Sequence, residues 1–142
     1  MRLFIAEKPS LGRAIAAGLG NQKKAEGCIR CGNDVVTWCF GHMLGQAWPR
    51  DYKPEYAHWR REHLPIIPSQ WKYKVKKDAA AQLDIIGSLL READSVVNAG
   101  DPDREGQLLV DEVLEHFRYT GQVERIWLAS LDDLSVKKAL AN

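Results

Sequence analysis

Short apolar runs alternate with segments of helical periodicity along most of this chain, and this alternation restricts its fold more than any other feature. Residues 2–6 (Arg-Leu-Phe-Ile-Ala) and residues 95–99 (Ser-Val-Val-Asn-Ala) are short, apolar and typical of buried parallel strands. A charged loop follows each run, and apolar residues then recur at helical spacing. Strands that alternate with helices in this way predict an α/β fold with a mostly parallel central sheet flanked by helices.

Turn and capping residues set the ends of the expected elements. Ser10 and Asp78 are expected to cap the first two helices, and Gly20 to end the first. Residues 32–34 (Gly-Asn-Asp) separate two apolar runs and predict a β-hairpin, because Gly and Asn tolerate positive φ. We expect helices over residues 11–19, 79–93, 104–117 and 135–142, and one more strand over residues 123–128. The expected buried residues of the 104–117 helix are Leu108, Leu109, Val113 and Leu114.

Residues 41–76 interrupt this alternation and predict an irregular insertion. Burial statistics favour packing of its aromatic residues onto the core over stacking on nucleic-acid bases. Its basic residues form either a solvated face or a patch that faces phosphates, and the sequence leaves both readings open. The aromatic residues are Trp48, Tyr52, Tyr56, Trp59 and Trp71, and the basic residues in the insertion and just after it are Arg50, Lys53, Arg60, Arg61, Lys72, Lys74, Lys76 and Lys77.

Length and charge place the chain among ordinary globular domains. Its 142 residues predict one domain over residues 1–142, with a hydrophobic core of its own. Twenty basic and nineteen acidic side chains give a net charge of +1, so global charge provides no argument for nucleic acid or membrane as a partner. The first apolar run is too short for a signal peptide, and no run reaches membrane-spanning length. We therefore expect a cytoplasmic protein that does not contact a membrane.

Three cysteines are an odd number, which argues against a disulfide framework. Cys28, Cys31, Cys39 and His42 offer a superficial set of zinc ligands, but the segment between the pairs is short for a zinc ribbon. Cys28 and Cys39 lie within apolar runs, which favours the interpretation that they pack as small hydrophobic residues.

Charged residues follow both of the strands described first. Glu7 and Lys8 follow residues 2–6, and Asp101, Asp103 and Glu105 follow residues 95–99. Open α/β sheets bind ligands beyond the carboxyl ends of their strands. If the two strands are neighbours, Glu7 joins the acidic cluster and Lys8 supplies a cation beside it.

Three carboxylates within a few residues favour a metal ion. Close carboxylates repel one another unless a cation lies between them, and hard oxygen ligands suit Mg²⁺, with Mn²⁺ as an alternative. Capping of the following helix is the simpler reading, and it explains one or two of the three carboxylates. We therefore expect Asp101, Asp103 and Glu105 to bind a divalent cation.

A Glu at the end of the first strand, paired with Asp-x-Asp-x-Glu-Gly at the end of a later strand, resembles the Toprim domain of topoisomerases, bacterial primases and some nucleases. Within that group, the finer resemblance is to the type IA DNA topoisomerases, and among them to topoisomerase III. Residues 1–10, Gly41-His42, residues 101–106 and residues 125–131 carry it, and it covers essentially the whole chain. One departure is Ala129, which stands where the family usually has the first serine of Trp-x-Ser-Ser.

The resemblance implies a Toprim-like fold and a transesterification in which a tyrosine attacks a DNA phosphate and the break is later resealed. Glu7 would be the general acid and base at the leaving 3′ oxygen, and Lys8 would stabilise the charged phosphate. Asp101, Asp103 and Glu105 would hold Mg²⁺. No energy cofactor is implied.

The resemblance also implies partners and further contacts. Candidate DNA-binding residues are His42, Arg104 and Arg125, with Arg104 facing a phosphate or forming a salt bridge to the acidic cluster. The expected partners are single-stranded DNA, RNA as a further substrate, and the remaining topoisomerase domains. None of the four tyrosines matches the family's nucleophile motif, so the domains that carry the catalytic tyrosine are expected to be absent and this chain alone to be inactive.

Two other functions remain as alternatives. Another Toprim enzyme, such as a primase or a small nuclease, would share the acidic motif but is not expected to share residues 1–10 or the long segment between Glu7 and Asp101. A DNA-binding module without catalytic activity belongs to a different class. It would bind DNA without cutting it.

Overall fold

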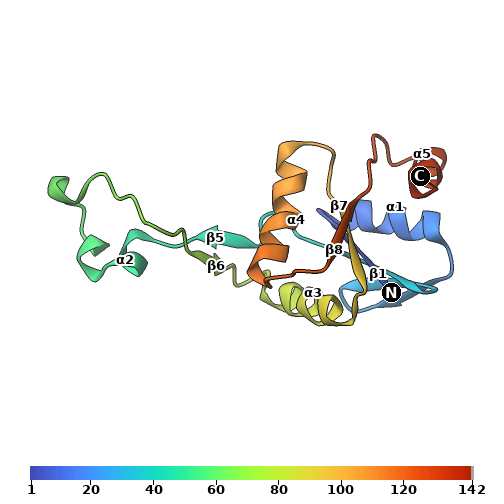
Figure 1. Cartoon of the computed structure of the whole chain (residues 1–142), viewed down its shortest axis with the longest axis horizontal. Helices are drawn as coiled ribbons and strands as arrows, with labels where there is room; N and C mark the ends of the chain where they lie inside the picture. The colour runs from blue at the N-terminus through green and yellow to red at the C-terminus, as the bar shows by residue number, and fades with distance from the viewer. Residues whose placement is uncertain (142) are drawn as a thin grey trace.

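A six-stranded sheet forms the centre of the computed structural model, which describes residues 1–141 (Figure 1). Its strand order is β2-β3-β4-β1-β7-β8. The strands are β1 (Arg2–Ala6), β2 (Gln22–Ala25), β3 (Cys28–Cys31), β4 (Asp34–Trp38), β7 (Ser95–Ala99) and β8 (Gln122–Arg125). The helices around it are α1 (Pro9–Leu19), α3 (Ala80–Glu92), α4 (Arg104–His116) and α5 (Asp133–Leu140).

Strand β1 lies between β4 and β7 and runs parallel to both. Strand β8 continues the parallel part beyond β7, with Val96 opposite Val123. The β3–β4 hairpin predicted around residues 32–34 is confirmed, with Gly32 at φ +65°. Strand β2, which the sequence analysis did not anticipate, pairs antiparallel with β3. The predicted mostly parallel α/β sheet is thus confirmed, with antiparallel strands added at one edge.

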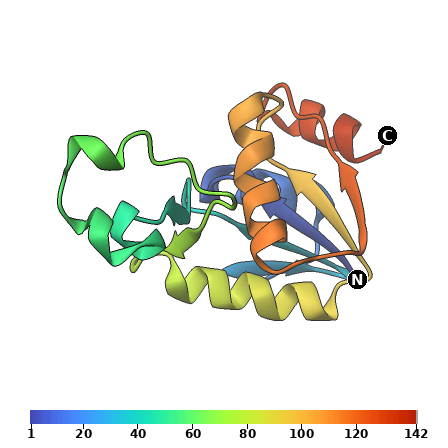
Figure 2. The same cartoon turned by 60° about the vertical axis from the view of Figure 1, so that its left-hand side comes forward.

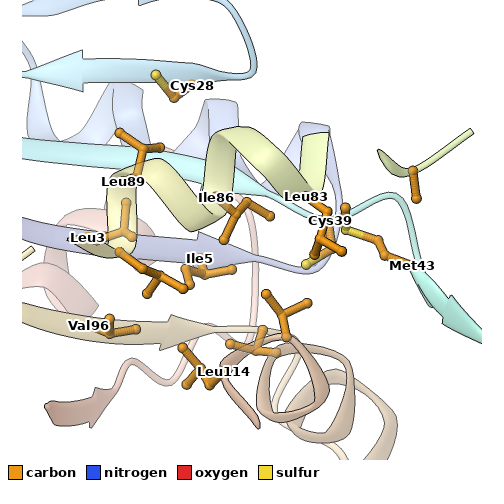
Figure 3. Packing of buried hydrophobic residues seen from close by; sticks show 14 of the residues in the cluster. Leu3, Ile5, Cys28, Cys39, Met43, Leu83, Ile86, Leu89, Val96 and Leu114 are labelled. Atoms are coloured by element: carbon orange, nitrogen blue, oxygen red, sulfur yellow. The ribbon is translucent and has the colours of Figure 1, made fainter. Parts of the chain in front are cut away.

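The side chains of β1 alternate between two hydrophobic layers, as the two-residue period of a strand requires. Leu3 and Ile5 pack with α3 and α4 on one face of the sheet (Figure 3). Phe4 and Ala6 pack with α1 and α5 on the other face. All four are almost completely buried, and full burial of one large apolar side chain is worth about 1.5–3 kcal/mol. Helices therefore cover both faces of the central strand.

The three cysteines are buried and are not joined in a disulfide, and the predicted burial of Cys28 and Cys39 as hydrophobic residues is confirmed. Cys28 and Cys39 belong to the core layer that α3 and α4 cover. Burial raises the pKa of Cys39 to about 12, and it also raises the pKa values of Cys28 and Cys31. The thiols therefore stay protonated near neutral pH.

Both predicted side-chain caps are wrong. Helix α1 begins at Pro9, before the expected cap Ser10, and Lys8 takes the N-cap position without a side-chain cap. Proline fits this first position because its fixed φ suits a helix and its missing N–H would have no partner there. Helix α3 begins at Ala80, and Ala79 rather than Asp78 precedes it, again without a side-chain cap. The predicted stop at Gly20 is confirmed, with φ +75°.

The C-terminal third differs from prediction in three details. Leu108 is half exposed on α4, whereas the expected burial of Leu109, Val113 and Leu114 is confirmed. Strand β8 ends at Arg125, three residues before the expected end. Helix α5 begins at Asp133, where Asp132 accepts a hydrogen bond from the Ser135 backbone N–H, and the predicted end of this helix at residue 142 lies outside the described residues.

A hairpin arm projects from the sheet between β4 and α3 (Figures 1 and 2). Its base is a two-stranded antiparallel sheet, which the sequence did not predict. Residues 45–78 include no buried residue, so the prediction that the aromatic residues of this segment pack onto the core is wrong. The elements of the arm are β5 (Leu44–Gln46), α2 (Pro49–Tyr52), the 3₁₀ turns η1 (Pro54–Ala57) and η2 (Arg61–His63), and β6 (Tyr73–Val75).

No helix within residues 1–141 combines the length and the apolar character that crossing a bilayer requires.

The turn between β7 and α4 is tightly packed and holds Asp101 in place. A Cβ atom on Gly100 would collide with the backbone of Gly106, and a Cβ atom on Gly106 would collide with the backbone of Asp101. Asp103 closes the turn, because its Oδ1 accepts a 2.7 Å hydrogen bond from the Gly106 N–H at the start of α4. The two glycines thus permit a close contact between backbones that a larger residue would prevent.

We predict that Gly106→Ala lowers the free energy of unfolding, because the new methyl group must push the Asp101 backbone away. The expected loss is about 1–3 kcal/mol, the usual cost of overpacking. Urea unfolding followed by circular dichroism measures it. Gly45→Ala is the matched control, since a Cβ there would meet only ordinary contacts, the nearest at 3.8 Å. Equal stability of the two variants would contradict the proposed role of Gly106.

Candidate active site at the ends of β1 and β7

Strands β1 and β7 are parallel neighbours, which was the condition for Glu7 and Lys8 to join the acidic cluster. Ala6 lies opposite Ala99 at the ends of the two strands, so Glu7 and Asp101 follow at the same edge of the sheet. The Asp101 backbone N–H donates a 3.1 Å hydrogen bond to Glu7 Oε2. The side chain of Glu7 is only 13% exposed, so this contact fixes its carboxylate at the edge of the core.

Lys8 lies between the two carboxylates and binds both. Its Nζ donates hydrogen bonds of 2.8 Å to Glu7 Oε1 and 2.9 Å to Asp101 Oδ2. The hydrogen bonds to Glu7 and then to Asp101 raise the pKa of Lys8. Burial by itself raises the pKa of Asp101, but the hydrogen bonds with Lys8 and Glu7 outweigh it, so that the pKa of Asp101 is lowered. An ammonium ion and an ionised Asp101 carboxylate therefore lie side by side at neutral pH.

The other two carboxylates of the acidic motif have different partners. Asp103 caps α4 through Gly106, and Glu105 is exposed and turned toward His42, with 3.7 Å between Glu105 Oε1 and His42 Nε2. Within residues 1–141, no three Asp, Glu, His or Cys side chains are grouped closely enough to share one metal ion. Asp101 thus lies beside Glu7 and Lys8, whereas Asp103 caps α4 and Glu105 faces His42.

His42 is held at the site by α4. Its Nδ1 lies 3.1 Å from Oε2 of Glu112, a carboxylate that is only 14% exposed. Glu112 was not predicted as a site residue, although the sequence contains a signal for it. Glu105 and Glu112 are seven residues apart on one helix, which places them on the same face. His42 therefore lies between two carboxylates of α4.

Arg125 supports the loop that carries Asp101. Its guanidinium donates 2.6 Å hydrogen bonds to Asn98 Oδ1 and to the backbone oxygen of Asp101, and it lies 5.5 Å from the centre of the Trp127 ring. Asn98 is buried and was missed by sequence analysis, although it is the one strongly polar residue of the apolar run that forms β7. The hydrogen-bonded N–H groups of Arg125 thus point toward other residues of the protein.

Arg104 is exposed in the first turn of α4, the position that we expected from the sequence. No ion pair within residues 1–141 includes it, so its guanidinium does not form the salt bridge to the acidic cluster that was one of its two expected roles.

A cleft of about 420 Å³ opens directly above Lys8 and Asp101. A positive side chain in such a cleft attracts a phosphate group, and one or two carboxylates beside a phosphate are the usual protein ligands of Mg²⁺. The oxygen donors of Asp101 and Asp103 fit such a hard cation, whereas the buried thiols do not. The residues that line the cleft are Lys8, Asp101, Pro102, Asp103, Leu128, Ala129, Ser130 and Leu131.

The chain is similar to known proteins over nearly its whole length. Residues 2–131 match the model of the Toprim domain family. The chain is 50% identical to DNA topoisomerase 3 of Haemophilus influenzae over 146 residues, which is 99% of this chain and 22% of that protein. It is also 50% identical to DNA topoisomerase 3 of Vibrio cholerae (98% and 22%) and 36% identical to that of Bacillus licheniformis (99% and 20%).

The fold has a counterpart among solved structures. Full-length topoisomerase I from Thermotoga maritima matches 99% of this chain and 20% of its own length, with a TM-score of 0.63 and 16% sequence identity. The chain spans about a fifth of the length of the relatives that it matches. It belongs to the Toprim domain family, and within that family it is similar to the N-terminal Toprim domains of bacterial DNA topoisomerase 3.

Proposed function

We propose that this chain is the metal-binding Toprim domain of a DNA topoisomerase III that cleaves and reseals single DNA strands by transesterification. The observation that carries the proposal is the contact of Lys8 with both Glu7 and Asp101 at the end of the central strands. A cation held between two carboxylates, in an open cleft, suits a reaction at a phosphodiester. The tyrosine nucleophile would come from another domain of the longer enzyme.

The roles of the residues follow from what each can donate or accept. During cleavage, the tyrosine oxygen loses its proton and bonds to the phosphorus of the 5′ phosphate, the bond from that phosphorus to the 3′ oxygen breaks, and the 3′ oxygen gains a proton. Glu7, a carboxylate that accepts hydrogen bonds from Lys8 and the Asp101 backbone in this structure, would take up a proton in balance with the one that the tyrosine releases, pass it to the leaving 3′ oxygen, and remove it again during resealing. Lys8 would stabilise the extra negative charge on the phosphate in the transition state, because its ammonium already lies in the cleft. His42, Arg104 and Arg125 remain the candidate residues for contact with the DNA backbone.

Asp101, Asp103 and Glu105 would hold Mg²⁺, or Mn²⁺ in its place, once Glu105 turns from His42 so that the three carboxylates, which are not grouped in this structure, meet around the ion. The bound cation would orient the DNA backbone and offset the charge of its phosphate. Two of these carboxylates already have partners in the absence of a metal ion. Asp101 already shares Lys8 with Glu7, and Asp103 already accepts a hydrogen bond from Gly106. Metal binding without DNA is therefore expected to be weak, since a phosphate would have to complete the ligand shell.

Similarity to several DNA topoisomerase 3 proteins favours this proposal over a primase, a small nuclease or a DNA-binding module without catalytic activity. The expected substrate is single-stranded DNA, with RNA as a second candidate, and the expected partners are the remaining topoisomerase domains. In a bacterium such an enzyme would act in the cytoplasm, where the chromosome lies.

We predict that Asp103→Asn weakens binding of Mn²⁺ to this chain by at least about tenfold, since even changes outside the first shell of metal ligands cost 10–100-fold. Asn keeps the ability to cap α4, so the loss would reflect the missing charge rather than a weakened helix. Isothermal titration calorimetry measures the affinity. Asp84→Asn, an exposed position on α3, is the matched control. Unchanged affinity of Asp103→Asn would argue against Asp103 as a ligand.

We further predict that this chain alone neither relaxes supercoiled DNA nor forms a covalent adduct with it, at any Mg²⁺ concentration. Relaxation should appear in a chimera in which the chain replaces the matching 22% of the Haemophilus influenzae DNA topoisomerase 3. In that chimera, Glu7→Ala should abolish cleavage, and Glu7→Gln should retain more because an amide still donates a hydrogen bond to the leaving oxygen.

The same chimera tests the role of the Lys8 ammonium group. Lys8→Ala should slow cleavage on the order of 10²-fold, the usual cost of losing one such electrostatic contact. Lys23→Ala serves as the control, because Lys23 is exposed on the edge strand β2. Gel assays of the nicked product measure all of these rates. A covalent adduct with the chain alone would mean that one of its own tyrosines is the nucleophile, which would overturn the proposed division between domains.

A further inference from the structure

The hairpin arm, defined as residues 45–78, combines exposure with aromatic character to an unusual degree. Trp48, Trp59 and Trp71 are 64%, 84% and 57% exposed. Several large apolar side chains left exposed on one segment favour a contact with a partner. The proposed transesterification at Glu7 and Lys8 gives no role to these rings, so the arm requires a separate explanation.

The arm is also the basic part of the molecule. It holds eight of the 20 basic side chains and four of the 19 acidic ones, a net charge of +4, which leaves −3 for the rest of the chain. The near-neutral total charge is therefore the sum of a basic arm and an acidic remainder of the chain. Within residues 1–141, no ion pair includes the arm residues Arg50, Arg61, Lys76 or Lys77. This polarity favours a polyanion as the partner of the arm.

Basic and aromatic groups alternate along the arm at short range. Arg50 lies 5.9 Å from the centre of the Trp48 ring, and Lys72 lies 5.5 Å from that of Tyr52. Within residues 1–141, Trp59 has no ring or cation contact of this kind, and Arg60 and Arg61 follow it in sequence. Stacking rings with cations beside them are the combination that binds bases and phosphates of a single strand.

A second cleft lies between the base of the arm and α4. It has a volume of about 500 Å³, with Trp71 and Tyr73 among its lining residues on the arm, and Glu112 and Glu115 among those on α4. Carboxylates repel phosphates but accept hydrogen bonds from the amino groups of bases. Glu112 also holds His42 at the active site, so this cleft and the active site share a residue.

We propose that the arm binds single-stranded nucleic acid, with Trp59 stacking on a base and Arg60 and Arg61 contacting phosphates, and that it guides the strand toward the acidic site. A duplex buries the faces of its bases, so the arm should prefer a single strand. This inference rests on the proposed function for the direction of the strand. The binding itself requires neither metal nor the groups of the acidic site.

Fluorescence anisotropy tests the proposal with this chain, EDTA and a labelled oligothymidine of about 16 nucleotides, the upper end of the range for small single-strand-binding folds. Trp59→Ala should weaken binding about fivefold or more, which corresponds to the loss of one stacked base. Leu134→Ala, an equally exposed apolar position on α5, should leave the affinity unchanged. Circular dichroism of each variant establishes that it is folded.

The double variant Arg60→Gln, Arg61→Gln tests the phosphate contacts through the salt dependence. Its plot of log affinity against log salt should become shallower by about 1.4, because two single-strand phosphate contacts are lost. Lys23→Gln, Lys24→Gln removes the same charge from the exposed strand β2 and should leave the slope unchanged. A ribonucleotide strand of equal length shows whether the arm prefers DNA or RNA, and binding of either one supports the proposal.

Several results would overturn the proposal. These are equal affinity of Trp59→Ala and the unchanged chain, a salt slope that the arginine variant does not alter, binding of duplex as tight as that of single strand, or no binding at low salt. If Trp59→Ala instead abolished self-association in sedimentation experiments and left DNA binding intact, the arm would be a contact between copies of the chain. If the arm did not bind nucleic acid, the proposed function would still stand, because cleavage by the chimera depends on Glu7 and Lys8.

Discussion

The parallel pairing of β1 with β7 is the constraint on which the rest of the molecule depends. It fixes the register in which Ala6 lies opposite Ala99, and it thereby brings Glu7 within hydrogen-bond distance of Asp101, 94 residues further along the chain. Both strands are buried between helices, so the pairing is sealed from water on both faces. The packed core thereby sets the distance between Glu7 and Asp101. Because both residues directly follow core strands, the site at the edge of the sheet is held in a fixed geometry.

Charge balance at this edge suits a phosphate. Lys8 offsets part of the repulsion between Glu7 and Asp101 and remains half exposed to the cleft. A divalent cation would add positive charge to the same cleft, and a DNA phosphate would bring the negative charge that both positive groups attract. We therefore expect metal and DNA to bind more tightly together than either does alone. The pairing of Lys8 with two carboxylates, the cap formed by Asp103 and the exposure of Glu105 are all consistent with a site that DNA completes.

The features that sequence predicts well are those with a local cause. The apolar alternation located β1 and β7, the glycine-containing turn located the β3–β4 hairpin, and the rule for parallel strands placed Glu7 near Asp101. Long-range packing decided the rest. Whether the arm aromatics pack on the core depends on where β5 and β6 direct the chain, and local residue patterns do not reveal that direction. Glu112 and Asn98 escaped notice because their importance comes from contacts with His42 and Arg125, which are distant in sequence.

Anomalous diffraction from crystals grown with Mn²⁺ and a short single-stranded oligonucleotide tests the central claim most directly. The claim is that the edge formed by β1 and β7 holds both a divalent cation and a DNA phosphate. The expected result is a manganese peak at about 2.0–2.2 Å from a carboxylate oxygen of Asp101 or Asp103, with a phosphate oxygen on the same ion and Lys8 beside it. A manganese peak elsewhere in crystals that contain bound DNA, or a DNA phosphate bound away from Lys8, would contradict the account.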